Sequence, residues 1–248
     1  MSRLRSLVLG LLGATAALVA APPVCADFVI VPVAADTAPY SFLPSLARGS
    51  STTLYAFRTF DENSTPHDFE TYLRFDVDRS DLPEGHVLAE ATLVVTYAFD
   101  FTGFGDTSDL PGTLACREVL EPWSESTLTW SNRPDVDVPF DTITDITGFG
   151  ALLCDATPVV LDWINGLTPN DGIALTSPTP RVMGLHSRES AASASSKPQL
   201  ILRTELPEPG VVVALAVGTT VVAACGRRRR RSSGSDRAAR PEQARARA

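Results

Sequence analysis

A ring, a cation and an acid alternate along one predicted strand, residues 71–77. Apolar and polar residues alternate there with a period of two, which is typical of a strand with one buried face. The apolar face must lie on a core, because exposing its side chains would cost about 1.5–3 kcal/mol each. Tyr72, Arg74 and Asp76 occupy the other face and are expected to point away from that core. Such a ring could stack on a sugar while the charged groups hydrogen-bond its hydroxyls.

A structural role fits the same three residues. In that alternative Arg74 pairs with Asp76 or with a neighbouring acid, and Tyr72 packs under a covering loop. The sequence leaves both alternatives open.

Two of the three tryptophans lie in one polar stretch, residues 121–134. Small polar residues between Trp123 and Trp130 favour side-chain to backbone hydrogen bonds over regular structure. We therefore expect a loop that enters a short strand at 127–130 and closes in a turn at 132–134. Both rings could be buried anchors, since ring burial is strongly stabilising. Alternatively, Trp123 is exposed as a stacking platform for a sugar and Trp130 is structural.

No sequence motif for catalysis is present. The chain lacks G-x-S-x-G, H-E-x-x-H and a glycine-rich phosphate loop, and its three histidines are far apart. Carboxylates are abundant, and a glycosidase needs only two of them at a fixed separation. Arg188 and Glu189 precede the last predicted strand, where an ion pair that ties a loop to the sheet is the simpler interpretation. We therefore expect no catalytic residues and no enzyme activity.

Charge limits the partners of the central part of the chain. Residues 27–205 contain 26 Asp and Glu against 10 Arg and Lys, a difference of 16, whereas the net charge of the whole chain is −8. Such an acidic surface argues against nucleic-acid binding, which depends on cationic side chains. It suits a hard cation such as calcium, although no regular calcium-loop motif is present. We expect no cofactor other than calcium, whose ligands the sequence does not identify.

Two cysteines, Cys116 and Cys154, lie in the same central part. Export to an oxidising compartment, which the chain ends indicate, would favour a disulfide between them. Such a bridge would add roughly 3–4 kcal/mol to the stability. Two buried free thiols are the alternative, because zinc would need more ligands than these cysteines and three scattered histidines supply.

Both ends of the chain have targeting signals. A short basic start, an apolar stretch and a small-residue cleavage pattern indicate a secretory signal peptide over residues 1–26. At the other end, a Pro-Glu-Pro triplet at 207–209 precedes an apolar run at 211–225 and five arginines at 227–231. The run is shorter than the roughly 20 residues of a comfortable membrane span, and the arginines favour the cytoplasmic side. Residues 232–248 are expected to form a disordered tail rich in Arg and Ala.

The segment 207–231 resembles the PEP-CTERM sorting signal of Gram-negative bacteria. In that family an exosortase-type enzyme processes the tail as the protein reaches the cell surface or the extracellular matrix. The resemblance implies export, a single C-terminal membrane span before processing, and a final place at the cell envelope, the surface or the matrix. An ordinary single-span anchor is the alternative.

The central domain, 27–206, resembles the DNRLRE-domain family, which overlaps with a family of carbohydrate-binding modules. The shared motifs are, in order, Y-L-R-F-D, A-x-L, W-S-E-x-T-x-T-W with a proline beyond, W-x-x-G, N-x-G-x-x-L, S-R-E and P-x-L. They lie here at 72–76, 91–93, 123–130 with Pro134, 163–166, 170–175, 187–189 and 198–200. The resemblance implies a jelly-roll sandwich and carbohydrate binding.

The predicted elements agree with an all-β domain. Many short runs of alternating polarity, with Pro- and Gly-rich links and no βαβ rhythm, favour an antiparallel sandwich. One short helix is expected, with Thr157 as its cap, Pro158 at its first position and Gly166 at its end. Trp163 completes the apolar stripe of this helix and is expected to pack against the sheet. The predicted strands are 53–57, 71–77, 87–99, 113–120, 172–176, 182–186 and 199–204.

Three classes of function remain open. The first, which the resemblance favours, is an exported, non-catalytic module that binds an exopolysaccharide or a cell-surface glycan. The second is a structural or adhesive matrix protein without a specific ligand, and the third is a polysaccharide-active enzyme. An exposed aromatic strip would favour the first, a featureless surface the second, and a cleft with two carboxylates of perturbed pKa the third.

Overall fold

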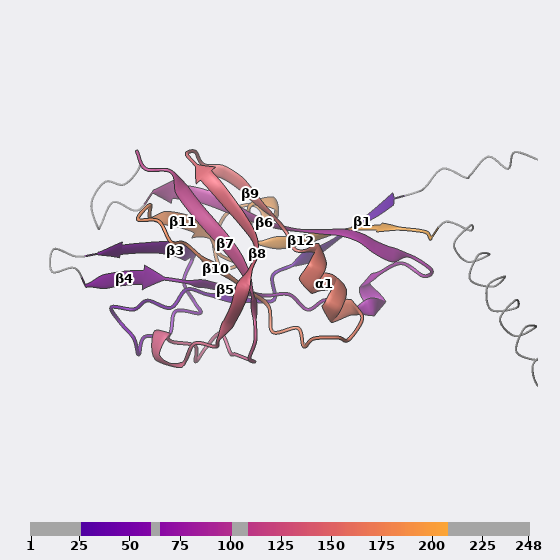
Figure 1. The fold of residues 1–248 in the computed structure, drawn as a ribbon, viewed down its shortest axis with the longest axis horizontal. Coiled ribbons are helices and arrows are strands. Elements are labelled where there is room, and N and C mark those ends of the chain that lie inside the picture. The colour runs from indigo at the N-terminus through magenta and orange to yellow at the C-terminus, as the bar shows by residue number, and fades with distance from the viewer. Residues whose placement is uncertain (1–25, 61–64, 101–108, 208–248) are drawn as a thin grey trace, which may run out of the picture.

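The computed structural model describes residues 26–60, 65–100 and 109–207, which form two antiparallel β-sheets and one short α-helix (Figure 1). Apart from their boundary residues Ala26 and Pro207, the predicted signal peptide and sorting segment lie outside these ranges. Within the described ranges, no helix is long and apolar enough to cross a membrane.

The larger sheet has seven strands and is organised around its longest, β6. This strand pairs with β12 along its first part, with β9 in its middle and with β11 at its end. β1 continues the sheet beside β12, and β3 and β4 continue it beside β11. The seven strands are β1 (Ala26–Pro32), β3 (Thr53–Phe60), β4 (Pro66–Phe69), β6 (Val87–Asp100), β9 (Gly150–Asp155), β11 (Met183–His186) and β12 (Gln199–Glu205).

The smaller sheet has five strands in the order β2-β5-β10-β7-β8. Its residues alternate between two faces, as the period-two pattern predicts. One face lies on the main core and the other is turned away from it. The five strands are β2 (Ala35–Thr37), β5 (Thr71–Arg74), β7 (Gly112–Val119), β8 (Val136–Ile146) and β10 (Ile173–Thr176).

One apolar core lies between the two sheets, so the domain is a β-sandwich. Leu73 and Phe75 enter the core from β5 and the residues after it, while Leu93 and Val95 enter from β6. All four are at most 2% exposed. Burial of this kind stabilises by about 1.5–3 kcal/mol for each large apolar side chain.

The predicted disulfide between Cys116 and Cys154 is confirmed. Cys116 lies on β7 in the smaller sheet, and Cys154 lies on β9 in the larger sheet. The bridge therefore joins the two layers of the sandwich through the core.

Seven of the eight predicted strands are present, with some changes at their ends, and the exception is the short strand predicted at 127–130. The strand predicted at 71–77 ends at Arg74, whereas the strand predicted at 53–57 continues to Phe60. The sequence patterns did not predict β1, β2, β4, β8 and β9. β8 is exposed along much of its length, and Pro139 interrupts its pattern. Its apolar residues alternate only from Val136 to Phe140 and fall out of step at Ile143 and Ile146.

The predicted helix is α1 (Thr157–Ile164), with Pro158 in its first turn and Gly166 beyond its end. Thr157 is not its cap. The hydroxyl of Thr157 instead accepts a hydrogen bond from the backbone N–H of Ala91 on β6, at 3.0 Å. Trp163 is 6% exposed within the main core, and its indole N–H donates to Glu118 Oε1 at 3.0 Å. The ring therefore anchors α1 against the sandwich.

Candidate functional site

The outer face of the five-stranded sheet is the face turned away from the main core. Tyr72 on β5, Ala174 on β10 and Arg117 on β7 are register partners across three adjacent strands, so they share this face. Thr176 and Ala115 form the next row along the same face. One continuous surface thus contains a residue predicted to bind a ligand and several that were not predicted.

A loop, residues 121–134, covers one half of the outer face. Leu128 enters from this loop and is 2% exposed. The loop is held locally, because the backbone N–H groups of Thr127 and Leu128 both donate to the carbonyl of Ser124. A small apolar cluster forms under it from Tyr72, Val119, Leu128 and Ala174, with Trp123 and Val136 against it.

Tyr72 is corrected from a ligand-binding candidate to a structural residue. Its side chain does point away from the main core, but it is fully buried under the loop. Its hydroxyl donates to Glu70 Oε2 at 2.8 Å, and burial, followed by the charge of Glu70, raises the pKa of Tyr72. A ring with no exposed surface cannot stack on a sugar. Strand alternation predicts the face of a residue but not the loop that covers it.

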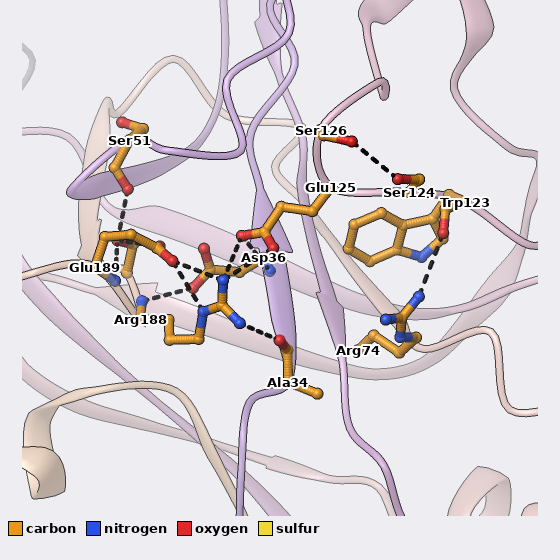
Figure 2. A network of polar contacts seen from close by, with 11 residues as sticks. Ala34, Asp36, Ser51, Arg74, Trp123, Ser124, Glu125, Ser126, Arg188 and Glu189 are labelled. Atoms are coloured by element: carbon orange, nitrogen blue, oxygen red, sulfur yellow. Dashed lines mark hydrogen bonds and ion pairs between the residues drawn. The ribbon is translucent and has the colours of Figure 1, made fainter.

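The edge of the covered half, beside the loop 121–134, contains Arg74, Asp76 and Trp123. Arg74 Nη1 donates to the carbonyl of Trp123 at 3.3 Å, and its guanidinium carbon lies 5.7 Å from the indole centroid (Figure 2). Asp76 is exposed, with an oxygen 3.9 Å from Arg74 Nε. These contacts match the alternative in which the polar row of β5 is structural.

Trp123 keeps some accessible surface. Its ring is half-buried and meets the ring of Tyr72 edge-on, with centroids 6.1 Å apart. Its indole N–H donates to the carbonyl of Asp171 at 2.8 Å. It also lines a cavity of about 320 Å³ that is formed by residues of the loop 121–134. Trp123 therefore remains accessible to a ligand, with its one N–H donor already engaged.

Trp130 does not lie in a strand. The strand predicted at 127–130 is wrong, because Asn132 Oδ1 accepts from the backbone N–H and the hydroxyl of Thr129 and closes a 3₁₀ turn at Trp130–Asn132. The Trp130 ring is half-buried, and the guanidinium of Arg133 lies 3.8 Å from its centroid. The ring stabilises the loop rather than the main core.

The other half of the outer face is an open groove of about 330 Å³, within the size range of ligand pockets. Arg58 on β3 and Asp68 on β4 form one wall. Ala115 and Thr176 lie along the sheet, and Thr142 on β8 lies opposite. The groove and the covered half are neighbours on one surface, with Arg117 at their boundary.

Two arginines supply hydrogen-bond donors to the groove. Arg58 makes two contacts with Asp68, Nε to Oδ1 at 3.1 Å and Nη2 to Oδ2 at 3.2 Å, while its side chain stays 53% exposed. Arg117 donates from Nε to the Thr176 hydroxyl at 3.1 Å and from Nη1 to the carbonyl of Asp137 at 2.9 Å. Each guanidinium has five N–H groups, so both are fixed in place with donors to spare.

A second polar cluster surrounds Arg188, on the loop after β11 (Figure 2). Arg188 Nε and Nη2 contact Glu189 at 2.9 and 2.8 Å, and Nη2 contacts both carboxylate oxygens of Glu125 at 3.0 and 2.9 Å. Its Nη1 donates to the carbonyl of Ala34. Arg188 and Glu189 thus connect their loop to the start of β2 and to the loop 121–134.

Asp36 is the buried member of this cluster. It lies on β2, is 1% exposed, and accepts the backbone N–H of Arg188 at Oδ2, at 2.6 Å. Burial, with the negative charges of Glu189 and Glu125 adding to it, raises the pKa of Asp36 to about 7, although the Arg188 N–H opposes this change. The oxygens of Asp36, Glu125 and Glu189 lie within 4.8 Å of one another.

Sequence reasoning missed the groove and two members of the acidic cluster. Arg58 is one of two exposed residues on β3, and Asp68 lies on β4, which has no clear strand signal. Asp36 and Glu125 are far apart in the chain and meet only through the fold. Two shared motifs were the available signals: S-R-E, which includes Arg188 and Glu189, and W-S-E-x-T-x-T-W, which includes Glu125.

A search of curated proteins finds no match to this chain. The family model described as Carbohydrate-binding module family 96 matches residues 44–204. This match includes both sheets apart from β1, β2 and the last residue of β12, and it includes the whole groove.

Proposed function

Because the chain belongs to carbohydrate-binding module family 96, we propose that it binds a polysaccharide without cleaving it, and that the sugar chain lies in the groove on the outer face. The observation on which this proposal depends is the family match over residues 44–204. The groove supports the proposed location, because it is an open, ligand-sized feature within the matched range.

The chemistry of the groove supports this proposal. Spare N–H groups of Arg58 and Arg117 can donate to sugar hydroxyls, and Asp68 and Thr176 can accept. Pro139 and Pro178 add exposed apolar surface for the C–H faces of a sugar ring. An arginine paired with an acid keeps the groove close to neutral locally, which suits a hydroxyl-rich ligand better than a highly charged one.

The groove acids favour binding over hydrolysis. Asp68 is held by Arg58, and Glu70 is held by Arg133 Nε at 3.1 Å and by the Tyr72 hydroxyl. A glycosidase needs one carboxyl that can give up a proton and a second that acts as base or nucleophile. Two carboxylates that are already engaged by fixed partners are poorly suited to these roles.

The chain ends suggest where the module acts. A signal peptide over 1–26 would export the domain, and a PEP-CTERM-like segment over 207–231 would retain it at the envelope, the surface or the matrix. We infer that the domain itself has a jelly-roll connectivity. An exosortase-type enzyme would process the tail. There the module would hold an exopolysaccharide or a cell-surface glycan. A structural or adhesive protein without a specific ligand is the alternative.

The test measures binding of the purified full chain to a panel of soluble polysaccharides by affinity gel electrophoresis and calorimetry. We expect at least one polysaccharide to bind, and Arg58→Gln to weaken it by about ten-fold or more, as loss of a charge-assisted contact implies. Arg203→Gln is the matched control, because Arg203 forms a similar 3.1 Å ion pair with Glu90 on the larger sheet, away from the groove. No binding across the panel, or equal weakening by both variants, would contradict the proposal.

A further inference from the structure

We propose that Asp36, Glu125 and Glu189 bind a calcium ion. Their carboxylate oxygens lie within 4.8 Å of one another. Calcium takes oxygen ligands at about 2.3–2.6 Å, so two ligands of one ion are at most about 5 Å apart. The three oxygens are therefore close enough to share one ion without movement of the backbone. This inference does not depend on sugar binding in the groove.

The charge of the cluster is unbalanced. Three carboxylates face the single guanidinium of Arg188, which leaves two negative charges without a partner when Asp36 is ionised and one when it is protonated. The nitrogens of Arg188 already contact Glu125, Glu189 and the carbonyl of Ala34. A divalent cation would neutralise this excess at a position where burial makes uncompensated charge costly.

Arg181, a buried arginine elsewhere in the same domain, shows what a balanced site looks like. Arg181 is 2% exposed and pairs with one acid, Asp100, through Nε to Oδ1 at 3.1 Å and Nη2 to Oδ2 at 3.2 Å. Its Nη1 donates to the carbonyls of Leu110 and Ile146. One cation meets one anion there, in contrast to the excess of acid around Arg188.

Asp36 gives independent support for a ligand. Its side chain is 1% exposed, and its Oδ1 has no hydrogen-bond partner among the described residues. A buried carboxylate oxygen without a donor costs free energy, so native proteins usually provide a partner. Because Asp36 belongs to the group of three converging carboxylates, an ion between them would supply that partner.

The surroundings leave room for an ion and its remaining water ligands. A cavity of about 400 Å³ lies beside the cluster and is lined in part by Glu125, Arg188 and Glu189. Gly49 also lines it, and a Cβ at this position would clash with the carbonyl oxygen of Glu125. Close packing of Gly49 therefore fixes the backbone that presents Glu125.

The ion would join three distant segments. Asp36 lies on β2, Glu125 lies in the loop 121–134 that covers Tyr72, and Glu189 lies on the loop after β11 (Figure 2). Calcium would thus fasten the covering loop to both neighbouring segments. We expect its removal to loosen the covered half of the outer face and to leave the fold of the sandwich intact.

The test titrates CaCl₂ into the full chain after treatment with EDTA, using isothermal calorimetry. We expect one ion per chain with saturation near or below about 1 mM, the range of extracellular calcium modules, and a higher melting temperature with calcium than with EDTA. Glu125→Gln, which removes one ligand charge, should weaken binding by about ten-fold or more.

Glu90→Gln is the matched control, since Glu90 also pairs with an arginine at 3.1 Å but lies outside the cluster, and it should bind calcium like the unaltered chain. The absence of saturable binding by the unaltered chain up to about ten times the expected concentration would overturn the proposal, whether or not the variants fold. A folded Glu125→Gln variant that binds calcium as tightly as the unaltered chain would overturn it as well.

Discussion

The two halves of the outer face share the same strand pattern but have different surfaces, one covered by a loop and the other open. Tyr72, Ala174 and Arg117 occupy one row across β5, β10 and β7. On one side of this row the loop 121–134 buries the face, whereas on the other side Ala115 and Thr176 line an open groove. The covering loop, rather than the residue types on the strands, therefore determines which residues of the outer face are buried and which are accessible to a ligand.

An aromatic residue that points away from the main core is not necessarily accessible to a ligand. Tyr72 faces away from the main core and would be a good stacking ring if it were bare, yet it forms the centre of a second small core. Arg58 and Arg117 belong to none of the shared motifs, but they line the open groove. Four predictions test this division, from the largest expected effect to the smallest.

Tyr72→Ala should destabilise the domain by about 3–5 kcal/mol, because it removes a fully buried ring from a closed cluster. Urea unfolding measures this loss. Tyr72→Phe is the control, since it keeps the ring and loses only the hydrogen bond to Glu70, at a cost of about 1.5–3 kcal/mol. If Tyr72→Ala instead keeps its stability and abolishes polysaccharide binding, the covered half is the binding half.

Replacing Cys116 and Cys154 together by serine should cost roughly 3–4 kcal/mol, because the bridge joins the two sheets. This change lies in the core beneath both halves, so it should lower the melting temperature without altering the polysaccharide affinity of the folded chain. Calorimetric titration below the melting transition separates these quantities. A large loss of affinity in the folded double variant would show that the groove depends on the bridge.

Trp123→Ala should cost about 1–3 kcal/mol, less than a full core deletion, since the ring is half-buried and its N–H bonds the carbonyl of Asp171. Its effect on polysaccharide affinity should be less than about three-fold, under about 0.7 kcal/mol. A much larger loss of affinity without a loss of stability would move the site to the cavity beside Trp123.

Surface changes on β8 should have the smallest effect on stability. Thr142 and Thr144 are both exposed on this strand, but only Thr142 lines the groove. Replacing either by tryptophan should change the free energy of unfolding by about 0.5 kcal/mol or less. Urea unfolding of both variants verifies this, and a large loss in either would disqualify it as a probe of the groove.

The sequence predicted the architecture because local patterns determine it. Alternation along strands such as β5 and β6, the proline and apolar stripe of α1, and two cysteines in one domain were sufficient for seven of the twelve described strands, the helix and the disulfide. β8 was missed because Pro139 interrupts it and its alternation is not continued beyond Phe140. The shared motif regions at 123–130 and 187–189 correctly indicated positions that matter, but not what they contact.

The sites could not be predicted because they depend on contacts between distant residues. Asp36 and Arg188 are 152 positions apart, and Arg188 and Glu125 are 63 apart. The burial of Tyr72 requires Leu128 to cross over it from a loop, and no periodic signal describes such a crossing. One sequence does not reveal which distant polar groups pair in the fold, whereas it does reveal which residues of one strand share a face.

The most direct test of the central claim, that a polysaccharide lies in the open groove, is the affinity of Thr142→Trp compared with Thr144→Trp. Both variants add the same ring to the same strand of the full chain, but only the first fills the groove. With a polysaccharide that the unaltered chain binds, Thr142→Trp should lose about ten-fold or more in affinity, about 1.4 kcal/mol, while Thr144→Trp binds normally. Equal, undiminished binding by both folded variants would contradict the account.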